Sequence, residues 1–308
     1  MPIDAAAGYS DDTGVKQRDF EYVLRPLLAV ARSCMKQSWA HSEFYYLDLN
    51  PGPGIVGGHE GSPIIFLRTA LSLGLPFRAF FFEKDEASVY RLREAAERAC
   101  PPSERWRVRV VLGDHGYTVA AKMATDLAEL PKKWVYGLAY ADPNGMIDLP
   151  LEPMASLAER FPQMDQLVNI SATTYKRVRL AGQHPRYLLG DLKKIKKSVA
   201  MVREPVGRWQ WTMVFLTNWA KAPEYKRAGF WRIDTPEGRD IVDRVNFSKS
   251  EREAGRTASG PFGANRPTGA MRNTFGTPDS LPFGLSFSSG VAASASAATR
   301  PVPLSRTT

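Results

Sequence analysis

The chain has 308 residues, of which 44% are hydrophobic, so we expect a sizeable core in one large domain or two smaller ones. No apolar run approaches the roughly 18 residues of a membrane span, and residues 1–12 lack the pattern of a secretory signal. Cys34 and Cys100 are too far apart for a disulfide framework or a zinc site. These features argue against membrane and disulfide-rich classes and predict a cytoplasmic protein without a bound metal.

Strand-like and helix-like segments alternate between residues 40 and 235, after a helical lead-in over residues 15–38. The predicted strands are 44–49, 77–83, 107–112, 134–141 and 166–170, and the predicted helices are 64–73, 85–99, 117–130 and 151–160. Segments 209–219 and 230–233 read as an antiparallel pair at the end of the sheet. This order predicts an α/β, Rossmann-like fold with a mainly parallel sheet and helices on both faces.

Two helix starts are marked by local signals. Ser62 is the expected N-cap of the helix over 64–73, with Pro63 in its first turn. Asp85 is the expected cap of the following helix. The expected organisation is a flexible N-terminus over 1–14, an α/β domain over 15–248 and a disordered tail over 249–308, where Gly, Pro, Ser and Ala predominate.

Acidic residues fall at the ends of four successive predicted strands: Asp48, Glu83, Asp114 and Asp142. In a doubly wound sheet those ends share one edge, so the four carboxylates are expected to face one crevice. Glu83 can accept hydrogen bonds from both ribose hydroxyls of an adenosine-type ligand. The simpler explanation of this residue is an exposed surface charge. Asp114 can accept from an adenine amine, or it can cap the next helix.

A glycine loop follows the first strand in the segment Asn50, Pro51, Gly52, Pro53, Gly54. Gly52, Gly54 and Gly57 match the dinucleotide fingerprint, but that motif requires a helix to begin inside it. Here the helix is not expected before Ser62. The loop is therefore open and long, which favours a ligand without a diphosphate, such as S-adenosylmethionine, over NAD or FAD.

The fourth strand ends in Asp142, Pro143, Asn144 and Gly145. Pro143 pushes Asp142 toward an extended conformation, and Asn144 followed by glycine is a strong turn signal. A tight turn alone would explain the motif. Because it stands at the strand end that faces the expected cofactor, we predict that Asp142, Pro143 and Asn144 are catalytic residues.

These motifs resemble class I S-adenosylmethionine-dependent methyltransferases and, more narrowly, the three-Cys-motif partner proteins, a bacterial family. The resemblance covers roughly residues 15–235. It implies that Asp48, Gly52 and Gly54 contact the methionine part of the cofactor, with Asn50 in the same loop. It also implies that Glu83 holds the ribose, that Asp114 holds the adenine edge, and that residues 142–145 face the acceptor.

Asn50, Pro51 and Asn144 depart from the pattern of that family. At position 144 an aromatic residue is usual, and adenine methyltransferases use an aromatic near there to stack a flipped base. Its absence makes direct methylation of a DNA base a weaker expectation. If the acceptor needs a general base, His59 and His115 are the candidates.

Two partners are expected. The family name implies a separate protein with three cysteines. The net charge of +9 and the basic residues between 175 and 197, interleaved with Tyr175 and Tyr187, favour a nucleic-acid surface, although solubility alone can explain such charge. The leading hypothesis is a methyltransferase of unknown acceptor. The alternatives are a non-catalytic binding or assembly module and, third, a nucleotide-dependent oxidoreductase.

Overall fold

The computed structural model describes residues 13–37, 43–114, 118–119, 122, 125–126, 135–143, 150–171, 195, 199–204, 211–218 and 229–245. All of them belong to one compact unit, Met1–Thr257. In this part of the chain, no helix has the length and apolar character that crossing a bilayer requires.

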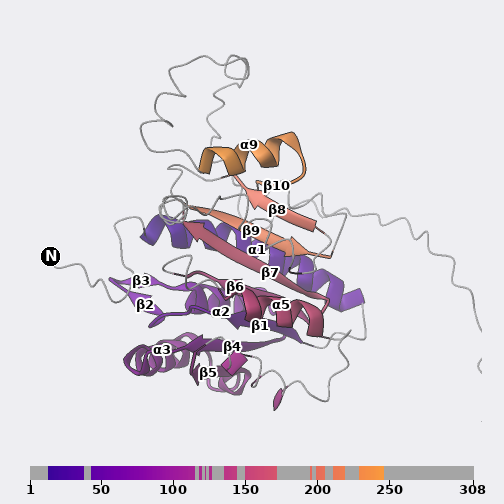
Figure 1. Cartoon of the computed structure of the whole chain (residues 1–308). Helices are drawn as coiled ribbons and strands as arrows, with labels where there is room; N and C mark the ends of the chain where they lie inside the picture. Colours follow the sequence, from indigo (N-terminus) through magenta and orange to yellow (C-terminus); the bar gives the residue numbers. More distant parts are fainter. Residues whose placement is uncertain are drawn as a thin grey trace, which may run out of the picture. The chain divides into compact units, whose positions relative to one another are not determined.

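An eight-stranded sheet with the order β10-β8-β9-β7-β6-β1-β4-β5 forms the centre of this unit (Figure 1). Its strands are β1 Phe44–Asp48, β4 Phe77–Glu83, β5 Val108–Leu112, β6 Tyr136–Ala141, β7 Met164–Ser171, β8 Val199–Arg203, β9 Trp211–Thr217 and β10 Phe230–Arg232. Neighbouring strands pair in parallel from β5 through β4, β1 and β6 to β7. In contrast, β9 and β10 run antiparallel to their neighbours. The predicted Rossmann-like fold is confirmed.

The chain reverses its direction of travel across the sheet between β1 and β6. From β1 it moves outward to β4 and β5, and it then returns to the other side of β1 to add β6 and β7. The carboxyl ends of β1 and β6 therefore flank the topological switch point, where open α/β sheets bind their ligands.

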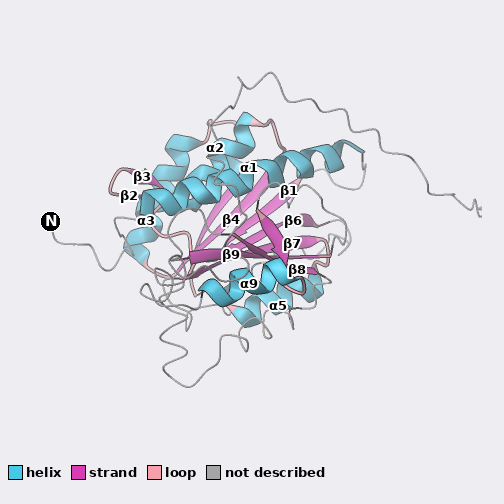
Figure 2. Cartoon of the chain, turned by 90° about the horizontal axis from the view of Figure 1, so that it is seen from above, coloured by secondary structure: helices cyan, strands magenta, loops and turns pink. Residues whose placement is uncertain are grey.

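Helices cover both faces of the sheet, as Figure 2 shows. On one side lie α1 Thr13–Gln37, α2 Ser62–Ser72 and α3 Glu86–Ala99, and on the other lie α5 Leu151–Arg160 and α9 Pro236–Val245. Because both faces are covered, all five residues of β1 are buried, as expected for a central parallel strand. The sequence therefore reads there as an apolar run that ends in an acid.

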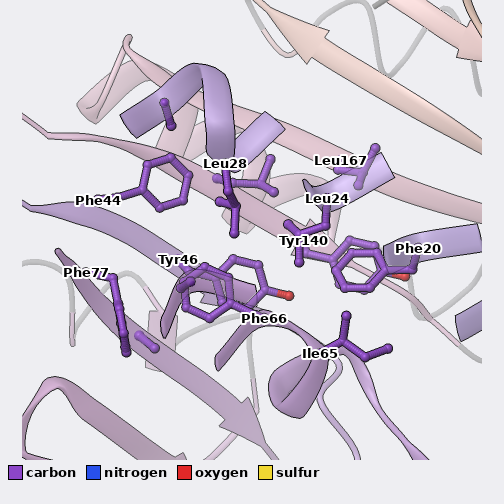
Figure 3. Packing of buried hydrophobic residues seen from close by; sticks show 14 of the residues in the cluster. Phe20, Leu24, Leu28, Phe44, Tyr46, Ile65, Phe66, Phe77, Tyr140 and Leu167 are labelled. Carbon is purple, nitrogen blue, oxygen red and sulfur yellow. The ribbon is translucent and has the colours of Figure 1, made fainter. Parts of the chain in front are cut away.

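Aromatic rings fill the layer between the sheet and the first helices (Figure 3). The ring of Tyr46 on β1 stacks on Phe66 of α2, with 3.9 Å between centroids and 7° between planes. The ring of Phe20 on α1 lies 4.3 Å from that of Tyr140 on β6. Both tyrosines thus sit on the face that α1 and α2 cover, Tyr46 in the middle of β1 and Tyr140 near the carboxyl end of β6.

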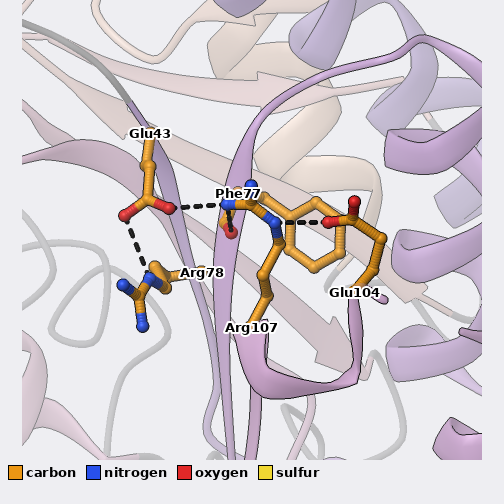
Figure 4. A network of polar contacts seen from close by, with 5 residues as sticks. All are labelled: Glu43, Phe77, Arg78, Glu104 and Arg107. Carbon is orange, nitrogen blue, oxygen red and sulfur yellow. Dashed lines mark hydrogen bonds and ion pairs between the residues drawn. The ribbon is translucent and has the colours of Figure 1, made fainter. Parts of the chain in front are cut away.

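The amino ends of β4 and β5 are joined by an ion-pair network on the opposite edge of the sheet (Figure 4). Glu43 accepts from Arg78 Nε at 3.0 Å and from Arg107 Nη1 at 2.6 Å, and Arg107 also pairs with Glu104. Both guanidinium groups lie over the ring of Trp106, at 4.2 and 4.5 Å. This network links the amino ends of neighbouring strands, far from the switch point at their carboxyl ends.

The predicted strands and most predicted helices are confirmed, and two details are corrected. Segments 209–219 and 230–233 contain β9 and β10, but these two strands do not pair with each other, because β8 lies between them and pairs antiparallel with both. The N-cap of α2 is Gly61, so Ser62 is the first residue of the helix rather than its cap, and its hydroxyl donates to Asp48. Asp85 caps α3 as predicted, accepting from Ser88 N at 2.8 Å.

Candidate functional site

Polar side chains from three adjacent strands and two helices meet at the switch point. We call them the strand-end cluster. Its members are Lys16 of α1, Tyr46 and Asp48 of β1, Ser62 of α2, Asp142 after β6 and Asn169 of β7. They lie on the face of the sheet that α1 and α2 cover, so the two helices and the strand ends together enclose them.

Asp48 is fully buried, and its carboxylate joins the glycine loop to α2. Oδ1 accepts from the amide of Asn50 at 3.2 Å. Oδ2 accepts from Ser62 Oγ at 2.6 Å and from the Tyr46 hydroxyl at 3.1 Å. In this structure Asp48 therefore holds the glycine loop and the start of α2 in place, and it shapes the site by positioning them.

Burial raises the pKa of Asp48 from 3.8 to about 7, and the nearby charge of Asp142 adds to the rise. The three hydrogen bonds to its oxygens oppose this change but do not cancel it. Burial also raises the pKa of Tyr46 and of Tyr140 well above 10. Both phenols therefore remain protonated and serve as hydrogen-bond donors near neutral pH.

Asp142 receives two nitrogen donors on the same carboxylate oxygen. Lys16 Nζ lies 2.6 Å from Oδ1, and Asn169 Nδ2 donates to the same atom at 2.9 Å. The side chain of Asp142 keeps 21% of its surface exposed. Unlike Asp48, it is thus partly accessible to solvent, and Pro143, which follows it, is buried.

Two buried amide oxygens at the switch point have no hydrogen-bond partner among the described residues: Asn50 Oδ1 and Asn169 Oδ1. Asn169 is only 3% exposed. A buried acceptor without a donor is unfavourable by about 1–3 kcal/mol. Gln166 Oε1 and Trp211 Nε1 are buried in the same way elsewhere in the described part of the chain.

The glycine loop is shaped by two residues in the left-handed region. Gly52 has φ +59°, and a Cβ built there would meet no atom within 4 Å, so this face of the loop is open. Gly54 has φ +79°, and its Cβ would come within 2.9 Å of Leu92 on α3. A short hairpin, β2 Ile55–Val56 and β3 His59–Glu60, follows, and α2 begins at Ser62. The predicted long, open loop is confirmed.

Glu83 and Asp114 stand at the carboxyl ends of β4 and β5, on the side of β1 away from β6. Glu83 Oε1 accepts from the amide of Asp85 at 2.9 Å, and its residue is partly exposed. Asp114 is exposed, and its carbonyl accepts from the amide of Thr118 at 3.1 Å. Three predicted acids thus line neighbouring strand ends in the order β1, β4, β5, as a ligand extended across them would require.

Helix α1 is fastened over the site by a buried ion pair. Asp19 pairs with Arg203 of β8, and the two side chains are only 7% and 3% exposed. Three residues earlier, Lys16 reaches Asp142. The anchored helix therefore fixes the place of Lys16 beside Asp142.

Two hollows lie away from the cluster. One, of about 440 Å³, runs between α1, the β2–β3 hairpin and α2, and His59 lines it. The other, of about 320 Å³, lies between α3 and β5 and is lined by Arg93, Arg105 and Arg109. No member of the strand-end cluster lines either hollow.

Several predicted features lie outside the described residues. They are most of the N-terminus over 1–14, most of the helix over 117–130, Asn144, His115, the tail over 249–308 and, except for Ile195, the basic segment 175–197. The predictions about them stay predictions.

The sequence analysis did not predict Lys16, Tyr46 or Asn169 as site residues, nor the hydrogen bond from Ser62 to Asp48. Asn169 left a signal, because it is a polar residue inside the apolar run of β7. Lys16 left none, since a lysine in an amphipathic helix is ordinarily solvated.

No family model matches the chain, and no curated protein matches it. Among solved structures, protein LPL1258 of Legionella pneumophila is 12% identical, with a TM-score of 0.43 over 68% of this chain and 89% of that one. A probable spermidine synthase of Corynebacterium glutamicum is 13% identical, with a TM-score of 0.43 over 74% and 79%. The fibrillarin pre-rRNA processing protein of Methanococcus jannaschii is 14% identical, with a TM-score of 0.36 over 58% and 68%.

Similarities at these levels carry no argument about function. The strand order, with its switch point between β1 and β6, identifies the fold directly. The chain has a Rossmann-like fold of the kind found in methyltransferases.

Proposed function

We propose that the chain is an S-adenosylmethionine-dependent methyltransferase. The cofactor would extend across the carboxyl ends of β1, β4 and β5, and the methyl acceptor would lie at Asp142. The observation that carries this proposal is the strand-end cluster at the switch point, preceded by a glycine loop that delays the helix until Ser62.

The groups at the switch point suit such a cofactor. The open face at Gly52 lets a ligand approach the backbone, and Asn50 Oδ1, which has no partner among the described residues, can accept from an ammonium group. Glu83 offers a carboxylate to ribose hydroxyls, with only Oε1 engaged by the Asp85 amide. No helix N-terminus stands inside the loop to bind a diphosphate.

The protein has little covalent chemistry to perform in this reaction. A bound sulfonium supplies the reactive methyl group, so positioning and exclusion of water account for much of the acceleration. Asp48 fixes the loop against α2, and Asp142 together with Asn169 would orient the acceptor. Because α1 covers this end of the sheet, the acceptor would react away from bulk solvent.

We also propose a class of methyl acceptor and a protein partner. The basic segment 175–197 supports a nucleic acid as the acceptor, or a surface that binds nucleic acid. The sequence motifs around Asp48 and Asp142 support an association with a three-Cys-motif protein. Neither proposal depends on the other.

A labelled-methyl screen tests the function. The full chain is incubated with methyl-labelled S-adenosylmethionine and DNA, RNA, lysate protein or small-molecule fractions. We expect transfer to one class, abolished by Asp142→Ala and retained by Asp126→Ala, whose side chain has a similar exposure of 23% and a similar lysine partner. Cofactor binding without transfer to any class would instead support the non-catalytic module.

A further inference from the structure

The hollow of about 320 Å³ between α3 and β5 lies at the edge of the sheet, because β5 is the last strand on that side (Figure 1). Its charged lining consists of three arginines, Arg93, Arg105 and Arg109, and one acid, Glu97. Three positive charges and one negative charge give this lining a net charge of +2. The hollow is therefore a basic site, separate from the strand-end cluster.

Two of these arginines are held by main-chain carbonyls. Arg105 Nη2 donates to the carbonyl of Glu97 at 2.9 Å, and its Nε donates to that of Cys100 at 3.3 Å. Arg93 Nη2 donates to the carbonyl of Val110 at 3.4 Å. A neutral carbonyl orients a guanidinium group but leaves its positive charge uncompensated. Each group also keeps N–H donors to offer, since a guanidinium carries five.

The third arginine and the acid complete the charged lining. Arg109 is exposed, and its side chain forms no ion pair with a carboxylate in the described part of the chain. Glu97 stands four residues after Arg93 on α3, and it too forms no ion pair within the described ranges. The hollow thus gathers three guanidinium groups that no described carboxylate neutralises. Planar guanidinium groups bind phosphate oxygens through two parallel hydrogen bonds.

An exposed aromatic ring stands beside this hollow. Tyr90 lies on α3 three residues before Arg93, so the two side chains are neighbours on the helix surface. Tyr90 is 65% exposed, the highest value among the large hydrophobic residues that the structure describes. An exposed ring next to a group of cations suits a single-stranded nucleic acid, because the ring stacks on an unpaired base while the cations contact the backbone.

We propose that the hollow binds a phosphate group of a single-stranded nucleic acid, with the three arginines on the phosphate and Tyr90 stacked on an adjacent base. Helix α3 connects the carboxyl end of β4 to the amino end of β5, and these two strands are parallel, so α3 runs antiparallel to both. Tyr90, in the first half of α3, therefore lies on the side of the hollow nearer the carboxyl ends of the strands. A nucleic acid bound in this way would run along α3 toward that edge of the sheet.

Two simpler roles of the arginines explain less. Charge on an edge strand keeps one sheet from pairing with another, but a charged residue anywhere on β5 would do so, and oriented guanidinium groups are not needed. An acidic peptide would be attracted by the same charge, but this attraction does not account for the exposed ring of Tyr90. The experiment therefore measures the contributions of charge and stacking separately.

Fluorescence anisotropy with a labelled oligouridylate of twelve nucleotides tests the site in the full chain. We expect Arg109→Ala to raise the dissociation constant about fivefold at low salt. The same variant should lower the slope of log K against log salt by about 0.7, because one cation no longer contacts a phosphate. Tyr90→Ala should weaken binding about fivefold or more without changing that slope, because stacking is not an ionic contact. Tyr90→Phe keeps the ring and should bind like wild type.

Two further variants make the result specific. Glu97→Gln removes the one negative charge of the hollow and keeps the carbonyl that Arg105 uses, so binding should tighten about twofold or more. This gain of affinity cannot arise from a folding defect. Arg91→Ala is the matched control, because Arg91 is an exposed arginine of α3 that does not line the hollow. It should bind like wild type.

Weaker binding by Arg109→Ala with a shallower salt dependence, together with tighter binding by Glu97→Gln, supports the site. No binding by the wild-type chain, equal losses in Arg91→Ala and Arg109→Ala, or an unchanged affinity in Glu97→Gln overturns it. Displacement of the oligouridylate by poly-L-glutamate at equal charge, with no effect of Tyr90→Ala, would assign the hollow to an acidic protein instead. Displacement by uridine monophosphate at equal concentration would assign it to a free nucleotide.

This inference does not rest on the proposed function, because it uses no group of the strand-end cluster. Binding of the oligouridylate by a chain that does not bind S-adenosylhomocysteine would keep the nucleic-acid site and remove the methyltransferase proposal. Binding of S-adenosylhomocysteine without binding of the oligouridylate would remove the inference alone.

Discussion

Ser62 Oγ, in the first turn of α2, donates a hydrogen bond of 2.6 Å to Oδ2 of the buried Asp48 at the end of β1. This bond spans the whole glycine loop, from the strand that precedes it to the helix that follows it. The loop is therefore closed by a side-chain contact rather than by a helix N-cap, and its shape depends on two residues 14 positions apart.

We expect Ser62→Ala to lower the free energy of unfolding by about 1.5–3 kcal/mol at pH 8, because it removes a donor from a buried, ionised carboxylate. At pH 5, where Asp48 is protonated, the loss should shrink. Urea unfolding at both values measures it. Ser72→Ala is the control on the same helix, since Ser72 donates only to the carbonyl of Thr69. Equal losses in the two variants, or no pH dependence, would contradict this role of Ser62.

The pH dependence of stability should follow Asp48. Its pKa is about 7 in the folded chain against an ordinary 3.8, so the folded state binds more protons between these values. Stability from this group is therefore full below pH 4 and is lost as the pH rises through 7. Between pH 5 and 8 the loss should be about 2–3 kcal/mol, and Asp48→Asn should abolish it. An unchanged pH profile in Asp48→Asn would assign the dependence to other groups.

The buried pair of Asp19 and Arg203 should hold α1 over the site. Asp19→Leu or Arg203→Met alone should lower stability by about 3–5 kcal/mol, because each leaves one buried charge without its partner. The double variant should recover most of that loss, since both charges are then gone. Thermal unfolding of the four proteins forms the cycle. Additive losses would show that the two side chains do not interact.

The two left-handed glycines should respond differently to alanine. Gly52→Ala should lower stability by about 1–2 kcal/mol from backbone strain alone, because the added Cβ meets no atom. Gly54→Ala should lower it by about 2–4 kcal/mol, because strain adds to the contact with Leu92. Denaturant midpoints compare them. The reverse order would mean that the loop packs differently against α3.

Much of the fold was predictable because parallel strands buried on both faces leave long apolar runs, as in β1 and β4. The acids at their ends were visible for the same reason, since Asp48 and Glu83 interrupt those runs. Strand β8 was missed because it is a short run of five residues that begins two residues after a lysine-rich stretch. Its place between β9 and β10 depends on long-range pairing that no local pattern records.

Of the site, only the presence of acidic residues at the ends of successive strands was predictable from the sequence. Sequence spacing does not tell that Asp48 is fully buried, whereas Asp142 remains partly exposed. Nor does it tell that Lys16, 126 positions before Asp142, reaches the same carboxylate. Such contacts arise from how α1 packs on the sheet, and this is set by the burial of Phe20 and the Asp19–Arg203 pair.

Isothermal titration calorimetry with S-adenosylhomocysteine tests the central claim most directly. We expect saturable binding at one site per chain, weakened about tenfold or more by Glu83→Ala, because a ribose hydroxyl would lose its acceptor. Glu94→Ala, an exposed glutamate on the neighbouring helix α3, should bind like wild type. No binding to the wild-type chain, or binding that Glu83→Ala leaves unchanged, would contradict the assignment of the cofactor site to the strand ends.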